Sequence, residues 1–308
     1  LPLAISVSIM ARKKFDDALA ALLLSLLMKL VHGEETIDHD FTVGSACAEP
    51  TIMPRHEGTQ NMWNYPRVLA HRGAGTLAPE NTLAALRRGF ELGFRAVEFD
   101  VMATRDDGLV LMHDPALGRT VAGSGSVGDM DIAELCAMDA GRWFSGEYTG
   151  ERVPLFEAAA HYCMNAGIFM NAEIKPVPGQ EARTGWLVAQ ACARLPAGSV
   201  LLSSFAAEAL VTARNAAPQL PRALLVEAVP PDWQQRLEAI DAVALHARAQ
   251  SLTPAQAHAV RAAGYGLLCY TVNDSAEALA LSAMGVDALC TDRLDVIGPE
   301  FFASAEKL

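Results

Sequence analysis

From Arg67 onward, short apolar runs with β-strand character alternate with segments whose apolar residues have helical spacing. Strands that alternate with helices are typical of βαβ units and a parallel sheet. About eight such repeats favour a closed (β/α)8 barrel of the TIM type over an open sheet. Because the candidates number nine, one more than this barrel needs, one of them is a side strand or a false prediction. The candidate strands are residues 68–70, 96–101, 110–112, 168–174, 200–203, 223–226, 242–245, 267–271 and 288–290.

Two parts of the chain do not follow this alternation. Residues 1–61 carry no pattern that continues into the rest, so we expect an N-terminal extension outside the fold, with Met62 as a candidate natural start. Residues 62–308 number 247, which suits one barrel, because α/β barrels run to about 250 residues as a single domain. Residues 118–150 interrupt the rhythm with several glycines, and we expect them to form a small insertion after the third strand.

Composition and charge exclude several classes of protein. Hydrophobic residues make up 51% of the chain and charged residues 19%, which excludes intrinsic disorder. The net charge is −12 and the longest basic cluster is residues 12–14, so we expect no binding to nucleic acid. Any phosphate group must therefore be met by a few local side chains.

The cysteines and the N-terminal apolar run bear on the location of the protein. None of the six cysteines belongs to a CxxC pair and most lie in apolar runs, as is typical of buried thiols in a reducing compartment. The apolar stretch 18–28 is shorter than the roughly 20 residues of a membrane span. We therefore expect a cytoplasmic protein without a stable membrane span, with export as the alternative if the N-terminal segment acts as a signal. The sequence leaves the oligomeric state open.

The polar residues that can carry chemistry lie at the ends of candidate strands. In a (β/α)8 barrel the carboxyl ends of the strands meet at one rim. Side chains two apart on a strand share a face, so paired polar residues there point the same way. We therefore expect four consecutive strands to deliver one constellation to the mouth of the barrel. Its members are His71 and Arg72, then Glu98 and Asp100, then His113, and finally Glu173 with Lys175.

Three carboxylates of this set predict a metal site. Glu98, Asp100 and Glu173 facing one interior would repel one another unless a cation or a basic partner offsets their charge. An all-oxygen site suits a hard divalent cation, Mg²⁺ or Ca²⁺, better than zinc. Together with Arg72 and Lys175, such a cation would make the mouth locally basic and favour an anionic substrate, most simply a phosphate ester.

Two short motifs predict local structure. Residues 79–82, Pro-Glu-Asn-Thr, predict a helix start with Asn81, or alternatively Thr82, as the N-cap. Glu80 within the same motif is a candidate brace for an arginine. Residues 106–108, Asp-Asp-Gly, are typical of a hairpin or a tight turn.

Residues 67–297 contain an ordered series of short motifs. They are Ala70-His71-Arg72-Gly73, Ala78-Pro79-Glu80-Asn81-Thr82, Val97-Glu98-Phe99-Asp100-Val101, Thr104-Arg105-Asp106-Asp107-Gly108, Met112-His113-Asp114, Glu173-Ile174-Lys175, Tyr270-Thr271-Val272-Asn273, Gly285-Val286-Asp287 and Thr291-Asp292-Arg293. Each motif is weak alone, but their order over about 230 residues is specific. In these motifs the chain resembles the glycerophosphodiester phosphodiesterase family, and in particular its short bacterial cytoplasmic branch.

The resemblance implies a barrel with a small insertion, one divalent cation, and hydrolysis of glycerophosphodiesters to glycerol 3-phosphate and an alcohol. It also implies site residues by position. His71 and His113 would be the acid and base pair, Glu98, Asp100 and Glu173 the metal ligands, Arg72 and Lys175 the phosphate contacts, and Glu80 the brace of Arg72. Tyr270 stands where the family usually has Trp, on the glycerol side of the pocket.

Other functions are compatible with the same residues. A phospholipase of the phosphoinositide or sphingomyelinase D type would share the barrel, the cation and the paired histidines, and would need an apolar rim for lipid. A metal-dependent sugar-phosphate isomerase or aldolase would use a Schiff-base lysine or an enediol base, for which Lys175 is the candidate. A non-catalytic binding barrel is disfavoured, because both histidines and all three carboxylates are present.

Overall fold

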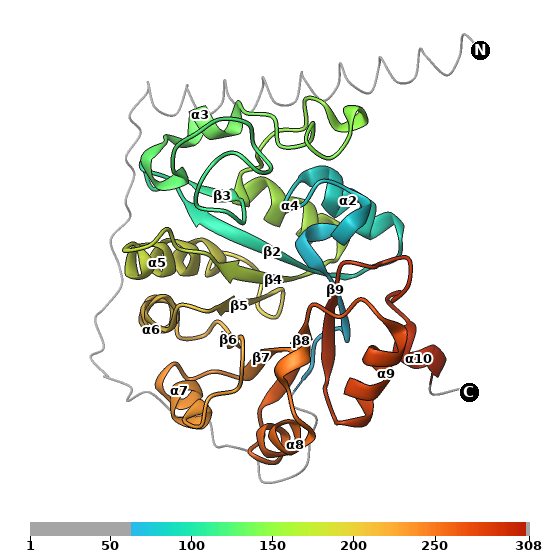
Figure 1. Ribbon diagram of the computed structural model, residues 1–308. Coiled ribbons are helices and arrows are strands. Elements are labelled where there is room, and N and C mark those ends of the chain that lie inside the picture. The colour runs from blue at the N-terminus through green and yellow to red at the C-terminus, as the bar shows by residue number, and fades with distance from the viewer. Residues whose placement is uncertain (1–62, 306–308) are drawn as a thin grey trace, which may run out of the picture. The chain divides into compact units, whose positions relative to one another are not determined.

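Eight short parallel strands close into a barrel in the computed structural model, which describes residues 63–305 (Figure 1). The hydrogen-bonded order is β1-β9-β8-β7-β6-β5-β4-β2, and Ala70 of β1 pairs with Val97 of β2 to complete the ring. The predicted (β/α)8 barrel is confirmed, whereas the predictions for residues 1–61 lie outside the described residues. The barrel strands are β1 (Val68–Ala70), β2 (Ala96–Ala103), β4 (Phe169–Ile174), β5 (Val200–Ser204), β6 (Arg222–Val226), β7 (Ala244–Arg248), β8 (Gly266–Tyr270) and β9 (Ala288–Thr291).

Helices connect successive barrel strands and cover the outside of the barrel (Figure 1). In the part of the chain that the structure describes, no helix is long and apolar enough to cross a bilayer. The connecting helices are α2 (Leu83–Glu91), α4 (Phe156–Ala166), α5 (Glu181–Cys192), α6 (Ala207–Ala216), α7 (Trp233–Ala239), α8 (Pro254–Ala262) and α9 (Ser275–Ala283), and α10 (Phe301–Ala305) follows the last strand.

The ninth candidate strand is a side strand. β3 (Leu109–Leu111) runs antiparallel to the outer part of β2, with Leu111 opposite Val101. Residues 106–108 make the predicted tight turn between them, where the Thr104 N–H donates to the Gly108 carbonyl at 2.9 Å. Because β2 extends beyond the barrel and the chain then folds back along it, β3 has no place in the ring.

This arrangement corrects one expectation about the site. His113 does not follow a barrel strand, so the prediction that four consecutive barrel strands deliver the site residues is wrong. Three barrel strands, β1, β2 and β4, deliver the others, and β3 returns His113 to the mouth from the opposite direction. The Met112 N–H donates to the Asp100 carbonyl at 3.1 Å, which holds His113 next to β2.

The insertion lies between β3 and α4, as predicted for the segment after the third strand (Figure 1). It contains α3 (Ile132–Cys136) and two 3₁₀ turns, η3 (Val127–Asp129) and η4 (Gly146–Tyr148). A small apolar cluster of its own includes Val121, Leu135 and Met102 of β2. The insertion is therefore packed onto the extended end of β2.

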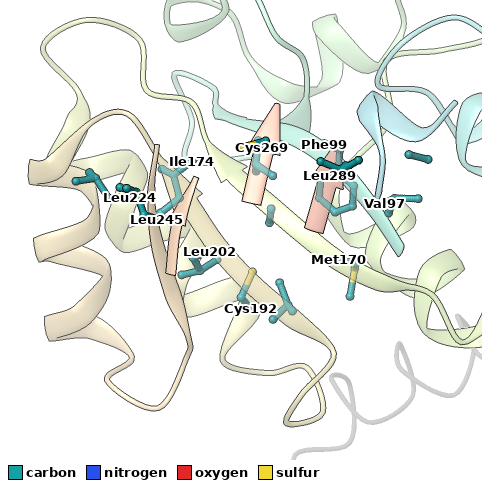
Figure 2. Packing of buried hydrophobic residues seen from close by; sticks show 14 of the residues in the cluster. Val97, Phe99, Met170, Ile174, Cys192, Leu202, Leu224, Leu245, Cys269 and Leu289 are labelled. Carbon is teal, nitrogen blue, oxygen red and sulfur yellow. The ribbon is translucent and has the colours of Figure 1, made fainter. Parts of the chain in front are cut away.

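The apolar core has an outer and an inner part. Val97 and Phe99 of β2 and Met170 of β4 point outward and pack beneath the helices (Figure 2). A second cluster, which includes Leu69, Leu201 and Leu268, fills the lumen of the barrel. Trp63 and Tyr65 belong with this inner cluster, together with Phe169. Since alternate residues face opposite sides of β2, its Glu98 and Asp100 point inward.

Candidate active site

The three carboxylates predicted to bind metal come together at the mouth. Asp100 of β2 lies opposite Glu173 of β4 in the strand register, and Glu98 lies two residues before Asp100 on the same face. One ligand oxygen from each of the three lies within 4.8 Å of the others, and all three side chains are buried. The geometry therefore forms an all-oxygen cluster able to hold a metal ion.

Burial of these carboxylates makes their charge unfavourable. Burial and the neighbouring Asp100 carboxylate raise the pKa of Glu98 to about 7 and that of Glu173 to about 8. Burial also opposes the charge of Asp100, but the positive charges of Lys175 and Arg72 outweigh it and lower the pKa of this carboxyl. Binding of a divalent cation would favour the ionised form of all three groups, so the donor set fits a hard cation.

Two basic side chains surround the cluster. Arg72 donates from Nη1 to Oε1 of Glu80 at 2.8 Å, and its Nε lies 3.7 Å from Oδ2 of Asp100. Lys175 Nζ lies 3.0 Å from Glu173 and 3.5 Å from Asp100. The contact between Glu80 and Arg72 expected from the sequence is present. An anion at the mouth would therefore meet two cationic side chains.

A tight turn places Arg72 at the mouth. The 3₁₀ turn η1 (His71–Gly73) follows β1 directly, and Arg72 adopts a left-handed φ of 50° within it. The Arg72 N–H donates to Oε2 of Glu98 at 3.1 Å, which ties the turn to the acidic cluster. Gly73 follows with φ 95°, a conformation that favours glycine.

Each of the two histidines is held by an aspartate. His71 Nδ1 lies 2.6 Å from Oδ1 of Asp292, and His113 Nδ1 lies 2.6 Å from Oδ1 of Asp114. A bonded Nδ1 leaves Nε2 of each ring for a reacting group. Burial would lower the pKa of His71, but the hydrogen bond to Asp292 and the charge of Glu98 raise it, whereas burial lowers the pKa of His113. The two rings therefore have opposite tendencies to hold a proton.

Of the two N-cap candidates for α2, Thr82 is confirmed and Asn81 is wrong. Thr82 caps α2, with its side-chain oxygen accepting from the Ala85 N–H at 3.1 Å. The side chain of Asn81 binds Asp100 twice, donating from Nδ2 to Oδ2 at 2.7 Å and accepting from the Asp100 N–H at 3.0 Å. It cannot cap the helix as well, because both of its polar atoms are engaged with Asp100.

Sequence reasoning also assigned no role to the aspartates that hold the histidines. Asp292 comes directly after β9, and its backbone N–H donates to Oδ1 of Asn273 at 2.8 Å. Its place at the carboxyl end of a barrel strand is the signal that would have marked it. Asp114 follows His113 directly, and this adjacency alone gave no geometric reason to pair them.

An aromatic pair lies on the other side of the mouth. Tyr270, at the end of β8, donates from its hydroxyl to the Val226 carbonyl at 2.9 Å. Its ring meets that of Phe205 edge to face, with 5.8 Å between the centroids. Both rings line a cavity of about 30 Å³ together with His71 and Glu173. A wider cleft of about 510 Å³, between α2 and the insertion, contains none of the predicted site residues, so chemistry rather than size marks the site.

Comparison with known proteins places this constellation in a family. The model of the Glycerophosphoryl diester phosphodiesterase family matches residues 71–296, a segment that contains all nine predicted site residues. The chain belongs to this family. It is therefore a phosphoric diester hydrolase, and the resemblance found in the sequence is confirmed.

Individual members of the family match over most of their length. A putative glycerophosphodiester phosphodiesterase of Bacillus subtilis is 31% identical over 240 residues, covering 75% of this chain and 96% of the relative. A glycerophosphodiester phosphodiesterase of Caldanaerobacter subterraneus is 32% identical over 231 residues, covering 73% and 93%. Among solved structures, an Oleispira antarctica phosphodiesterase in complex with the product sn-glycerol-3-phosphate matches with a TM-score of 0.73 and 37% identity, covering 79% of this chain and 97% of that one.

Proposed function

We propose that this phosphodiesterase hydrolyses glycerophosphodiesters to glycerol 3-phosphate and an alcohol, with one divalent cation, Mg²⁺ or Ca²⁺, at the mouth of its barrel. The observation that carries the proposal is the convergence of three buried carboxylates, two basic side chains and two histidine–aspartate pairs on one rim. The product bound to the Oleispira antarctica phosphodiesterase supports this class of substrate.

The cation would be held by Glu98, Asp100 and Glu173. Their buried oxygens, within 4.8 Å of one another, match the hard oxygen ligands that Mg²⁺ and Ca²⁺ prefer. When bound, the cation would neutralise charge on the phosphate and make its phosphorus more open to attack. Asn81 holds Asp100 from the side, and so fixes the direction in which this carboxylate points.

The remaining residues of the site have two roles, phosphate binding and proton transfer. Arg72 and Lys175 bind the non-bridging oxygens of the phosphate. One of the two histidines removes the proton of the attacking hydroxyl, and the other protonates the leaving alkoxide. Asp292 and Asp114 bind Nδ1 of the rings and so direct each Nε2 toward the substrate. The attacker is water or the glycerol hydroxyl, and detection of a cyclic phosphate distinguishes these two routes.

Substrate binding involves the aromatic side of the mouth as well. The Tyr270 ring lines the same cavity as His71, and its hydroxyl is already bound to Val226, so it offers the substrate a fixed ring face. Phe205 beside it is half exposed at the mouth. We assign Tyr270 to the glycerol side of the substrate, where an apolar ring packs against carbon atoms rather than against the phosphate.

The deciding experiment is release of glycerol 3-phosphate from glycerophosphocholine, glycerophosphoethanolamine and glycerophosphoglycerol, measured with and without EDTA. We expect release that EDTA abolishes and that Mg²⁺ or Ca²⁺ restores. Cleavage of intact phospholipid but not of these water-soluble diesters would instead favour the hypothesis that the enzyme is a phospholipase. A Schiff base between Lys175 and the carbonyl of a sugar phosphate, trapped as a stable secondary amine when borohydride reduces its C=N bond, would favour the aldolase interpretation.

We also propose that the enzyme works in the cytoplasm. The five cysteines in the described residues are unpaired thiols, and four of them are buried, which agrees with the expected reducing compartment. Cell fractionation with antibody detection tests this proposal, and recovery of the mature chain outside the cytoplasm would contradict it.

A further inference from the structure

Arg119, in the insertion, binds two carboxylates, Glu80 and Asp114, each of which holds a different residue of the proposed site. Its Nη1 and Nη2 donate to the two carboxylate oxygens of Glu80 at 2.7 Å each. Its Nε donates to Oδ2 of Asp114 at 2.5 Å. A guanidinium carries five N–H donors in one rigid plane, and here three of them bind two separate carboxylates.

Each of these carboxylates also binds a residue of the proposed site, Arg72 or His113. The Oε1 atom of Glu80 also accepts from Nη1 of Arg72 at 2.8 Å. The other oxygen of Asp114 binds Nδ1 of His113 at 2.6 Å. A continuous chain of polar contacts therefore runs from Arg72 through Glu80, Arg119 and Asp114 to His113.

The two ends of this chain come from different parts of the fold. Arg72 belongs to the turn after β1, whereas His113 follows the side strand β3. Arg119, which links them, lies near the start of the insertion, shortly after β3. Proton transfer and phosphate binding act on different oxygens of one phosphate group, so Arg72 and His113 have to keep a fixed distance from each other.

We propose that Arg119 is a positioning residue that fixes Arg72 and His113 relative to each other, so that the insertion completes the site that the barrel begins. This inference rests on the proposed function, because it takes Arg72 as a phosphate contact and His113 as a proton-transfer group. The Arg119 side chain is 44% exposed and makes three charged hydrogen bonds to two carboxylates, an arrangement that can also stabilise the fold. The positioning role is therefore tested by readouts that a purely stabilising role would not change.

The first test compares Arg119→Ala and Arg119→Lys with a matched control. Arg105 is also an exposed arginine next to the insertion and binds Asp131 through two atoms, at 3.0 and 2.9 Å, but contacts no carboxylate of the site. We expect Arg119→Ala to lower kcat and to raise KM for glycerophosphocholine, with a combined effect of about 10- to 100-fold. Arg119→Lys should restore little, because an ammonium lacks the planar fork, and Arg105→Ala should behave like the wild type.

The second test is a pair of double-mutant cycles. If Arg119 acts on kcat through Asp114, then Arg119→Ala should have little further effect on kcat in an Asp114→Asn background. If it acts on KM through Glu80, the same should hold for KM in a Glu80→Gln background. Fully additive effects in both cycles would overturn the proposal, as would a loss of activity that only parallels a loss of melting temperature.

A readout that does not need hydrolysis separates this proposal from the proposed function. Imidazole ¹⁵N NMR reports the hydrogen bond at Nδ1 of His113, and we expect its signal to change in Arg119→Ala while that of His71, held by Asp292, does not. If the wild type released no glycerol 3-phosphate, the proposed function would fail, and the NMR result would still decide the role of Arg119. An unchanged His113 signal would refute it.

Discussion

Glu98 and Asp100 place two carboxylates in the interior of a barrel whose neighbouring residues are apolar. Alternation along β2 turns them inward while Val97 and Phe99 face the helices (Figure 2). Their mutual repulsion in a buried site is offset in part by Arg72, and a bound cation would offset the rest. The same charges that repel one another would favour a bound cation.

The first prediction is that Glu98→Gln lowers the affinity for Mg²⁺ or Ca²⁺ at least about tenfold, because one of three anionic ligands becomes neutral. The fold should persist, since the amide is isosteric with the carboxylate. Isothermal titration with each metal and circular dichroism check both parts. Glu208→Gln, an exposed position on α6, is the control. Full catalytic activity of Glu98→Gln in the presence of EDTA would show that catalysis does not require a metal ion at this site.

The second prediction concerns the histidines. His71→Ala and His113→Ala should each lower kcat by a factor of about 10² to 10⁴, which is the range that general acid or base catalysis supplies. The double variant should lose little more than either single variant, because both rings serve one transition state. Steady-state kinetics measures the three variants, with His161→Ala on α4 as the exposed control. Activity close to that of the wild type would remove the residue concerned from the mechanism.

The residues of the site were predictable to different degrees, and sequence separation explains the difference. Glu98 and Asp100 were found because they are two apart on one apolar strand, a pattern visible locally. Asn81 was misassigned as a cap because its partner Asp100 lies on another element, 19 residues away. Asp292 lies 221 residues from His71, so only the closed barrel brings them together.

At the scale of elements, the contact between α2 and the turn after β1 determines where Arg72 lies. A Cβ atom at Gly89 of α2 would lie 2.2 Å from the Gly73 carbonyl oxygen. The helix therefore approaches the turn as closely as it does because this position lacks a side chain. Glycine in a helix is otherwise unfavourable by about 1 kcal/mol relative to alanine.

The third prediction is that Gly89→Ala destabilises the protein despite the higher helix propensity of alanine. Overpacking of this kind raises the free energy of the folded state by about 1–3 kcal/mol, and it should also displace the turn that carries Arg72. We expect a lower melting temperature together with a higher KM. Gly298→Ala, where no atom lies within 4 Å of the added Cβ, is the control. An unchanged melting temperature in Gly89→Ala would contradict the prediction, because it would mean that α2 can shift away from the turn at Gly73 without loss of stability.

Elements were predicted best where the apolar pattern alone decides them. The prediction of nine strands included β3 among the barrel candidates, although the predicted turn at residues 106–108 separates it from β2 by too few residues for a parallel crossover and so indicates an antiparallel hairpin. The predicted strand 242–245 begins too early, because the Ala242 N–H donates to the Leu237 carbonyl at 2.9 Å in the turn that follows α7. This bond spans five residues and is typical of a helix end, and an apolar pattern does not distinguish a residue in such a turn from the first residue of the next strand.

At the scale of the whole molecule, we expect one buried histidine to make the stability of the barrel depend on pH. His246 of β7 is fully buried in the lumen, and neither ring nitrogen has a hydrogen-bond partner among the described residues. Burial lowers its pKa to about 3, whereas a histidine in an unfolded chain has a pKa of about 6.5. Below the latter value the unfolded state therefore binds a proton that the folded state does not.

The fourth prediction follows from this difference. Through His246, the free energy of unfolding should fall by up to about 1.4 kcal/mol per pH unit as the pH drops from about 6.5 toward 3. His246→Leu removes this contribution, so its unfolding free energy should depend less on pH. Urea unfolding at several pH values measures both proteins, with His161→Ala as the control. Parallel pH profiles of His246→Leu and the wild type would contradict the prediction.

The last prediction concerns residues 1–61. Every barrel strand and every proposed site residue lies in the described residues, from β1 onward. Just before β1, Trp63 is buried against the inner cluster, and the Tyr65 ring stacks on Phe169 with 4.6 Å between the centroids. A chain that starts at Met62 keeps both aromatic residues, so its melting temperature and kcat/KM should match those of the full chain.

A chain that starts at Arg67 is the informative comparison, because it lacks these aromatic residues. Removing Trp63 and Tyr65 uncovers apolar surface in the lumen around Leu69 and Phe169, and large buried aromatic side chains contribute about 3–5 kcal/mol. We therefore expect the chain 67–308 to melt at a lower temperature than the chain 62–308, and scanning calorimetry compares the two. If the chain 62–308 gave only aggregate, or if activity reached the membrane fraction only with residues 1–61 present, the extension would have a role in folding or location, and the proposed cytoplasmic enzyme would have to be revised.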